Sequence, residues 1–261
     1  MGESFENPHI ALAMGKVTTL EINRPEKRNA VNAAMWKSLL AACDRIARNP
    51  EMKVLLLKGR GHHFCSGADI SEFSDAYGTD ASAESYNRDY RAVETALRHL
   101  GVPVIGEIRG ACFGGGLGLA LSADFRFCDR SAMFAVTASK LGIAYSAEDT
   151  ARVIEKIGPV RAKDMLFSAR TIGAEEALTW NLVDRVFSKD DLEAGVRDYA
   201  GTLATRSRAS LRAIKKIVNA LVEPDMAVCD NLRPTYSELF RGPDIVEGAR
   251  AFMEKREPNF E

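Results

Sequence analysis

The sequence has few cysteines, no long apolar run and no excess of charge of either sign. Its cysteines are odd in number and widely spaced, without a C-x-x-C pair, which argues against a disulfide framework or a zinc ribbon and indicates reduced thiols. No apolar stretch approaches the ~20 residues that a membrane span requires. The first residues lack the basic and then apolar pattern of a secretory signal. We therefore expect a soluble, cytoplasmic protein. The cysteines are Cys43, Cys65, Cys112, Cys128 and Cys229.

Several binding motifs are also missing. Thirty-five Lys and Arg against 36 Asp and Glu give a net charge of −1, so no overall field favours nucleic acid or a membrane as a partner. The phosphate-binding patterns G-x-G-x-x-G and G-x-x-x-x-G-K-S/T are absent, as is the G-x-S-x-G turn of α/β-hydrolases. His62 and His63 have no partners at metal-ligand spacing, so we expect a solvated surface pair and no metal site.

Apolar periodicity nevertheless indicates a substantial core, with strands that alternate with helices in the first half and mostly helices after Gly142. This order predicts an α/β protein with a helical C-terminal extension. The polar segment 74–85 is predicted to be a mobile loop. The predicted strands are 9–13, 17–22, 54–57, 104–108, 125–128 and 182–187. The predicted helices are 33–48, 86–100, 117–121, 149–157, 160–167, 175–180, 192–205, 210–222 and 245–255.

Two glycine loops, 64–70 and 110–118, share one context, because each follows an apolar strand and precedes a helix. The first amides of a helix have no internal acceptor, and glycine lets a ligand approach the main chain. Two such amides, one from each loop, would form an oxyanion hole that stabilises negative charge on a carbonyl oxygen. The alternative is that the glycines only permit turns and close packing. Residue types alone leave both interpretations open.

Five stretches of the sequence, in order along nearly the whole chain, resemble the enoyl-CoA hydratase/isomerase (crotonase) superfamily. They are Ile22-Asn23-Arg24-Pro25 with Asn29-Ala30, Phe64 to Ile70, Gly110 to Leu117 with Ala123-Asp124, Gly173 to Val183, and Ala251 to Arg256. The resemblance implies a crotonase-like spiral of ββα units over residues 1–200 and a helical C-terminal oligomerisation region over 201–261. It also implies an acyl-coenzyme A substrate, no tightly bound cofactor, and a homotrimer or dimer of trimers.

The resemblance further assigns roles to residues. It implies an oxyanion hole formed by the amides of Ala68 and Gly115 around the thioester carbonyl. The coenzyme A would lie along the segment from Ser66 through Asp69 to Ile70. Lys27 and Arg28 match a region near the nucleotide. Phe252 and Lys255 match positions that reach the coenzyme A of a neighbouring subunit, where the Lys255 ammonium suits a phosphate.

The sequence departs from the family at the two glutamates with which hydratases add water. The corresponding positions are Gly118 and Ala138, and neither side chain can transfer a proton. We therefore expect a thioester enzyme that stabilises an enolate, of lyase or isomerase type, with weak or absent hydratase activity.

Candidates for the missing acid and base lie just after residue 138. Tyr145 resembles a tyrosine of the methylmalonyl-CoA decarboxylase branch, and its alternative role is a packed phenol with a structural partner. Glu148 is a candidate base if it points inward, although Ser146 and Asp149 also indicate a helix N-cap with an acidic first turn. Asp69 is expected to order its own loop or to cap a short helix near Ser71. A decarboxylase and a non-catalytic acyl-CoA binder remain alternative functions.

Cys65 and Cys112 flank the two glycine loops, and neither has a nearby His or Lys in the sequence. We expect both to pack as small apolar residues rather than to act as nucleophiles.

Overall fold

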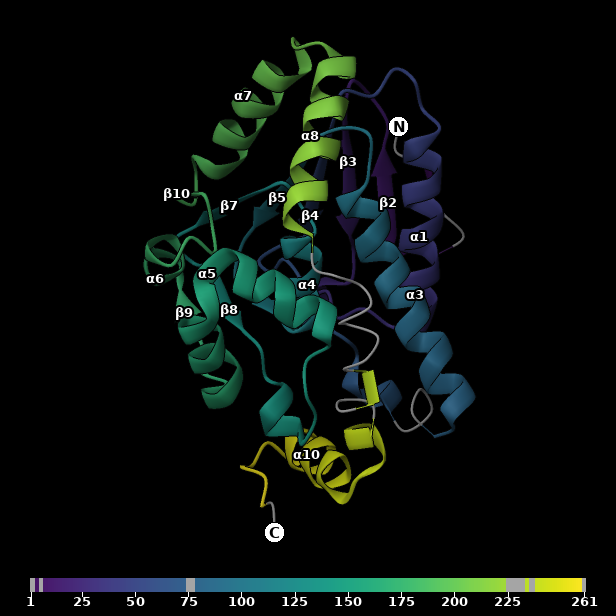
Figure 1. The fold of residues 1–261 in the computed structure, drawn as a ribbon, viewed down its shortest axis with the longest axis vertical. Helices are drawn as coiled ribbons and strands as arrows, with labels where there is room; N and C mark the ends of the chain where they lie inside the picture. The colour runs from purple at the N-terminus through teal and green to yellow at the C-terminus, as the bar shows by residue number, and fades with distance from the viewer. Residues whose placement is uncertain (1–2, 5–6, 74–77, 224–232, 235–237, 260–261) are drawn as a thin grey trace.

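A computed structural model describes residues 3–4, 7–73, 78–223, 233–234 and 238–259. The chain folds around a seven-stranded sheet in the order β1-β2-β3-β4-β5-β7-β10 (Figure 1). Strands β1 to β3 are antiparallel, and the remaining neighbours pair in parallel. Their bounds are Glu3–Ser4 (β1), Ile10–Ala13 (β2), Val17–Ile22 (β3), Val54–Gly59 (β4), Val104–Ile108 (β5), Phe125–Asp129 (β7) and Arg185–Phe187 (β10).

Both faces of the central sheet are covered, which explains why its strands read as continuous apolar runs. Alternate residues of a strand point to opposite faces, so Leu55 and Leu57 enter the main core while Val54 and Leu56 meet helix α7 (Leu192–Ala204). The main core also contains residues of α1 (Ala33–Ala47), α3 (Asp80–Arg98) and α4 (Gly115–Leu121).

A second, three-stranded sheet was not predicted from the sequence. It consists of β6 (Ala111–Phe113), β8 (Met133–Ala135) and β9 (Ile172–Gly173). These strands are too short to show alternation, and their pairing joins segments that are distant along the chain. The sheet fixes the second glycine loop, because β6 leads directly into α4.

Helix α3 begins earlier than predicted, at Asp80 rather than Tyr86. Thr79 caps it by accepting a hydrogen bond from Ser82 N at 3.1 Å, and Thr79 N donates to Ser82 Oγ at 3.2 Å. The polar residues that suggested a loop therefore form a capping box. The segment 74–77, also predicted to be mobile, lies outside the described residues.

The C-terminal half is mostly helical, as predicted. It contains α5 (Ala147–Ser168), α6 (Ala174–Thr179), α8 (Arg208–Val222) and α10 (Pro243–Glu254). Helix α5 breaks at Gly158, before Pro159, which accounts for the two separate segments predicted there. Helix α10 lies at the opposite end of the molecule from α7 (Figure 1) and packs against the short helix η3 (Ala138–Leu141). No helix of the described part of the chain has the length and apolar character that crossing a membrane requires.

Candidate active site

The two glycine loops lie against each other. Cys65 N donates to Ala111 O at 3.0 Å and Phe113 N donates to Cys65 O at 3.0 Å, so the loops pair as a short parallel bridge. Side chains at two glycines would prevent this approach. A Cβ on Gly116 would lie 2.2 Å from Cys65 O, and one on Gly67, whose φ is +102°, would lie 2.9 Å from Phe113 O. The glycines therefore permit close packing of the two loops, which was one of the two interpretations of the sequence.

The same contact also brings two backbone amides together. Gly115 is the first residue of α4, so its N–H has no acceptor within the helix. Within the described chain neither this N–H nor that of Ala68 donates a hydrogen bond. A Cβ on Gly115 would lie only 3.7 Å from Ala68 N. Both residues line one pocket, so the two donors can meet one oxygen atom there.

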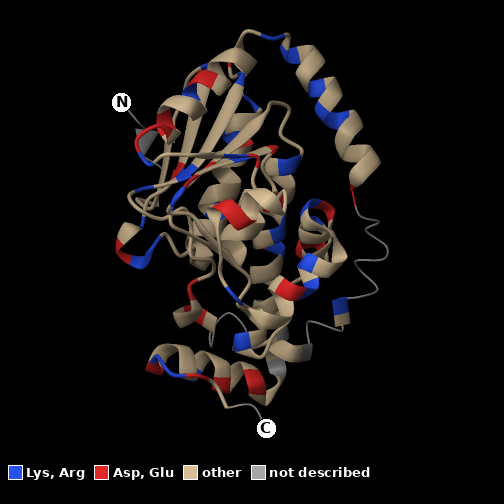
Figure 2. Ribbon diagram, turned by 90° about the vertical axis from the view of Figure 1, so that its left-hand side faces the viewer, with Lys and Arg blue, Asp and Glu red and all other residues tan. Residues whose placement is uncertain are grey.

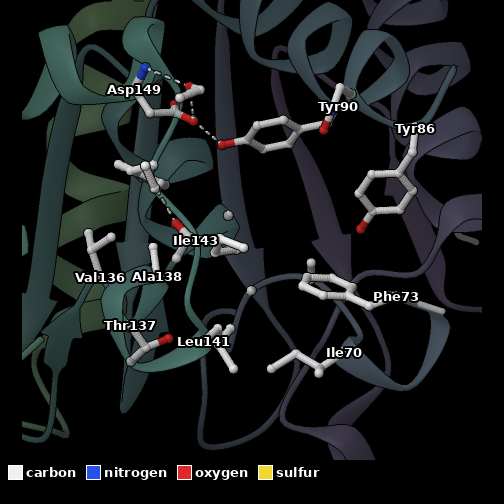
Figure 3. A pocket seen from close by; sticks show the side chains of 18 of the residues that line it. Ile70, Phe73, Tyr86, Tyr90, Val136, Thr137, Ala138, Leu141, Ile143 and Asp149 are labelled. Atoms are coloured by element: carbon white, nitrogen blue, oxygen red, sulfur yellow. Dashed lines mark hydrogen bonds between the residues drawn. The ribbon is translucent and has the colours of Figure 1, made fainter. Parts of the chain in front are cut away.

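This pocket has an apolar part and a polar part. Ile70, Phe73, Leu141 and Ile143 form the apolar part, whereas Tyr90 points toward Asp149 at the other end (Figure 3). Trp36 adds an aromatic wall, because its ring meets the Tyr90 ring edge-on with centroids 5.0 Å apart.

Gly118 and Ala138, where the family resemblance predicts the glutamates of hydratases, belong to α4 and η3. Ala138 lines the pocket. Gly118 is buried beneath it, and other side chains fill the space beside it. A Cβ on Gly118 would lie 2.1 Å from Glu94 Oε1, 2.7 Å from Tyr90 Oη and 3.1 Å from Asp149 Oδ1.

These side chains form a buried network around one guanidinium. Arg152 Nη1 donates to Glu94 Oε2 at 2.6 Å and to Asp149 Oδ1 at 2.8 Å. The hydroxyls of Tyr90 and Ser146 both donate to Asp149 Oδ2. Burial, and after it the charge of Asp149, raises the pKa of Glu94 well above its ordinary value. Among the described residues that line the pocket, Asp149 is the single carboxylate.

The structure places Tyr145 in the pocket wall, with its hydroxyl donating to Gly114 O at 2.9 Å. Burial raises the pKa of this phenol well above its ordinary value, with a smaller contribution from Asp149. Its proton is therefore engaged by the chain itself. The Gly114 carbonyl is thus the structural partner expected if Tyr145 is a packed phenol.

Glu148 and Asp149 point in different directions. Ser146 caps α5, as predicted, by accepting from Asp149 N at 3.0 Å. Asp149 enters the active-site pocket, whereas Glu148 lines a separate cavity between α3 and α5 and lies 3.7 Å from Arg233. The structure thus places Asp149, rather than the candidate base Glu148, in the pocket that Ala68 and Gly115 also line.

The residues expected along the coenzyme A are close together at one rim. Ser66 N donates to Arg28 O at 3.0 Å, and Ser66 Oγ donates to Lys27 O at 3.3 Å. Asp69 caps the short helix η2 (Ile70–Glu72) through Ser71, as predicted, and forms an ion pair of 2.7 Å with Arg24. Ser66, Ala68 and Ile70 line the pocket.

Phe252 and Lys255 are absent from the lining of this pocket. Phe252 is exposed on α10, and Lys255 ends that helix in a left-handed conformation.

Other predicted groups have structural roles. His63 Nδ1 accepts from Ala111 N at 3.1 Å, so this residue is not the solvated side chain that the sequence suggested. Burial and the nearby charge of Arg28 lower its pKa. Cys65 and Cys112 are fully buried as small packed groups, and burial raises the pKa of the Cys65 thiol to about 12. The described residues contain no group of three or more His, Cys, Asp or Glu side chains that could hold a metal ion.

Sequence reasoning missed Glu94, Arg152 and Tyr90. A signal existed for two of them, because Tyr90 and Glu94 are four residues apart and share a helix face with buried apolar residues. A charged residue on such a face needs a buried partner. Nothing local indicates that the partner is Arg152.

Comparisons with known proteins show the family of this chain. The family model described as enoyl-CoA hydratase/isomerase matches residues 13–261. The mitochondrial Delta(3,5)-Delta(2,4)-dienoyl-CoA isomerase of Mus musculus is 31% identical, over 97% of this chain and 81% of its own. The chain belongs to the enoyl-CoA hydratase/isomerase (crotonase) superfamily and is an enzyme of that acyl-CoA family.

Solved structures show the same fold. An enoyl-CoA hydratase from Mycobacterium avium subsp. paratuberculosis superposes with a TM-score of 0.85 at 28% identity, covering 97% of this chain and 98% of that one. A methylmalonyl-CoA decarboxylase superposes with a TM-score of 0.86 over the same shares at 24% identity, a likeness that concerns the fold alone. These relatives are named for different reactions, so the reaction of this chain must be argued from its own site.

Proposed function

We propose that the protein moves a carbon–carbon double bond in a coenzyme A thioester through an enolate, with Asp149 as the proton-transferring group. One observation carries the proposal: the Asp149 carboxylate lines the same pocket as the unpaired amides of Ala68 and Gly115, while residues 118 and 138 supply no carboxylate. The dienoyl-CoA isomerase name of one relative supports the same reaction class.

The number of carboxylates separates isomerisation from hydration. Hydration of this type needs one group to activate water and another to protonate the α-carbon, whereas isomerisation needs one group that removes a proton and later returns it. Asp149 would take a proton from the carbon beside the thioester carbonyl. The electron pair would move onto the carbonyl oxygen, where the two amides stabilise the negative charge. The same carboxyl group would return the proton at the far end of the dienolate, so no co-reactant is consumed.

The coenzyme A portion is assigned to the rim formed by Lys27, Arg28 and the segment 66–70. The two exposed cations suit phosphate groups, and hydrogen bonds between the segments hold them together. Phe252 and Lys255 would complete the site of a neighbouring subunit, which fits their exposure away from the pocket of their own chain.

A homo-oligomer built through residues 201–261 is part of this proposal, because α8 turns its apolar side outward. Ile214, Ile217 and Leu221 are 56%, 59% and 80% exposed. Lys215 instead faces its own chain, forming an ion pair of 2.8 Å with Asp124. Figure 2 shows that α8, with its Lys and Arg residues in blue, lies along one side of the molecule. Such an inverted surface helix requires a partner to cover the apolar side.

The proposal is tested by incubating the protein in deuterated water with enoyl-, 3-hydroxyacyl-, malonyl- and methylmalonyl-CoA thioesters and following the products by mass spectrometry. We expect deuterium uptake and double-bond migration without gain of water. Asp149→Asn should remove both, by about 10²–10⁴-fold, while thioester binding persists. Glu148→Gln is the matched comparison, because it removes the adjacent carboxylate that lies outside the pocket.

Each other outcome contradicts the proposal in a specific way. Efficient gain of water would show that hydration does not need carboxylates at residues 118 and 138. Loss of carbon dioxide that depends on Tyr145 would establish the decarboxylase alternative. Saturable binding with every thioester returned unchanged would establish a non-catalytic acyl-CoA binder. Loss of activity in Glu148→Gln but not in Asp149→Asn would assign the proton transfer to Glu148.

A further inference from the structure

Glu94 extends from α3 into the space that a side chain at residue 118 would occupy. Its Oε1 atom lies 2.1 Å from the position of a Gly118 Cβ, and the carboxyl group is fully buried. Within the described chain Oε1 has no hydrogen-bond partner, whereas Oε2 is held by Arg152. A buried carboxylate oxygen without a donor is costly. A protonated carboxyl group is instead a donor, and the neighbouring Asp149 side chain, which interacts with Glu94, can accept its hydrogen bond.

The charges around Glu94 Oε1 also favour a protonated carboxyl group. Helix α3 contributes Tyr90 and Glu94, and α5 contributes Asp149 and Arg152, while α4 has no charged side chain. Tyr145 adds a neutral phenol from the preceding loop. Two ionised carboxylates on one guanidinium would leave a net negative charge in the interior, and one added proton would cancel it.

We propose that Glu94 and Asp149 form a coupled carboxyl pair that holds one proton, and that Glu94 thereby acts as a positioning residue for Asp149. With the proton on Glu94, Asp149 is ionised, bound to Arg152 and able to accept a proton from a ligand in the pocket. Loss of this shared proton would place another negative charge beside the enolate and oppose its formation. The singly protonated pair is therefore the active form. The catalytic part of this inference rests on the proposed function, and the proton sharing does not.

Proton sharing is tested without any substrate. The whole protein is labelled with ¹³C at the glutamate side-chain carboxyl carbons and titrated by NMR, and the Glu94 signal is assigned from its disappearance in Glu94→Gln. We expect Glu94 to remain protonated well above pH 4.5, the ordinary value for glutamate. In Asp149→Asn its titration should move down by about 1–3 pH units, because a like charge has been removed. An ordinary titration in the wild type would overturn the inference, as would one unaffected by Asp149→Asn.

The consequence for catalysis is tested by the pH dependence of kcat for the isomerisation. The wild type should show two limbs that belong to the pair. Glu94→Gln should lose the alkaline limb. This limb reflects loss of the proton held by Glu94, and a glutamine side chain does not titrate. A merely structural role would lower activity at every pH and leave both limbs in place, which would overturn the catalytic part. If no thioester turns over, the proposed function fails, while the NMR titration still decides whether the proton is shared.

Discussion

The Tyr145 hydroxyl donates a hydrogen bond of 2.9 Å to the carbonyl oxygen of Gly114, the residue directly before Gly115, whose amide is one of the two proposed oxyanion-hole donors. The phenol therefore supports the turn that presents this amide. A role as proton donor to a substrate carboxylate would require it to leave this acceptor.

Replacement of Tyr145 by phenylalanine is expected to have a small effect. The Gly114 carbonyl also accepts from Gly118 N at 3.1 Å, so it keeps one partner. We expect a loss of about 0.5–1.5 kcal/mol in the free energy of unfolding, and a much smaller loss of turnover than in Asp149→Asn. Urea denaturation and thioester turnover measure these effects. A loss of turnover equal to that of Asp149→Asn would instead give Tyr145 a direct part in the reaction.

The oxyanion hole can be tested by removing one donor. Gly115 is the first residue of α4, where proline is tolerated because the N–H has no helical acceptor. Gly115→Pro should lower kcat by about 10²–10³-fold with the fold intact. Gly115→Ala is the matched control, since it adds a Cβ at ordinary contact distances and keeps the N–H. Steady-state kinetics and circular dichroism compare the two, and equal activities would exclude a catalytic role for this amide.

The protonation of Glu94 should appear in the stability of the protein. Its pKa is higher in the folded chain than in the unfolded chain, so its contribution is fully present below pH 4.5 and is lost as the pH rises toward the folded value. Glu94→Gln cannot lose a proton. The unfolding free energy of this variant should therefore rise relative to the wild type above pH 4.5, by at most about 1.4 kcal/mol per pH unit.

Urea denaturation at a series of pH values measures this difference. Glu51→Gln, at an exposed site, is the control for the chemical change itself. A difference between Glu94→Gln and the wild type that is constant with pH would show that Glu94 is not preferentially protonated in the folded chain.

The contact between residues 94 and 118 predicts coupled mutations. Gly118→Ala adds a Cβ only 2.1 Å from Glu94 Oε1 and should displace that carboxyl group from Arg152. In a Glu94→Ala background the same substitution should cost much less. We expect a coupling energy of about 0.5–3 kcal/mol in the unfolding free energies of the four proteins. Additive effects would mean that the two sites do not compete for this space.

The outward apolar side of α8 predicts that charged substitutions there will change the oligomeric state. The double substitution Ile217→Lys and Leu221→Lys should convert the proposed oligomer to smaller species, because it places charge where a partner would bury apolar surface. Light scattering after size-exclusion chromatography measures the mass. Glu193→Lys, an exposed charge reversal on α7, is the control. A wild-type monomer, or an assembly unchanged by both lysines, would contradict the proposed oligomerisation through α8.

The class of the fold could be predicted because its signals are local. The run Val54 to Leu57 and the spacing of apolar residues in α1 reflect burial of neighbouring residues in one element. The short strands of the second sheet carry no such signal, since their existence depends on a partner segment. The start of α3 was missed because the residues of a capping box are also those of a loop.

The sequence by itself determined the α/β class, the two glycine loops that bear the amides of Ala68 and Gly115, and the absence of carboxylates at residues 118 and 138. Each of these is a property of one short segment. Only the tertiary structure decided which acids reach the pocket. Glu148 and Asp149 are adjacent in sequence, but consecutive residues of a helix project about 100° apart, so one enters the pocket and the other leaves it. Glu94 joins Asp149 because packing brings α3, α4 and α5 together and Gly118 leaves the space open.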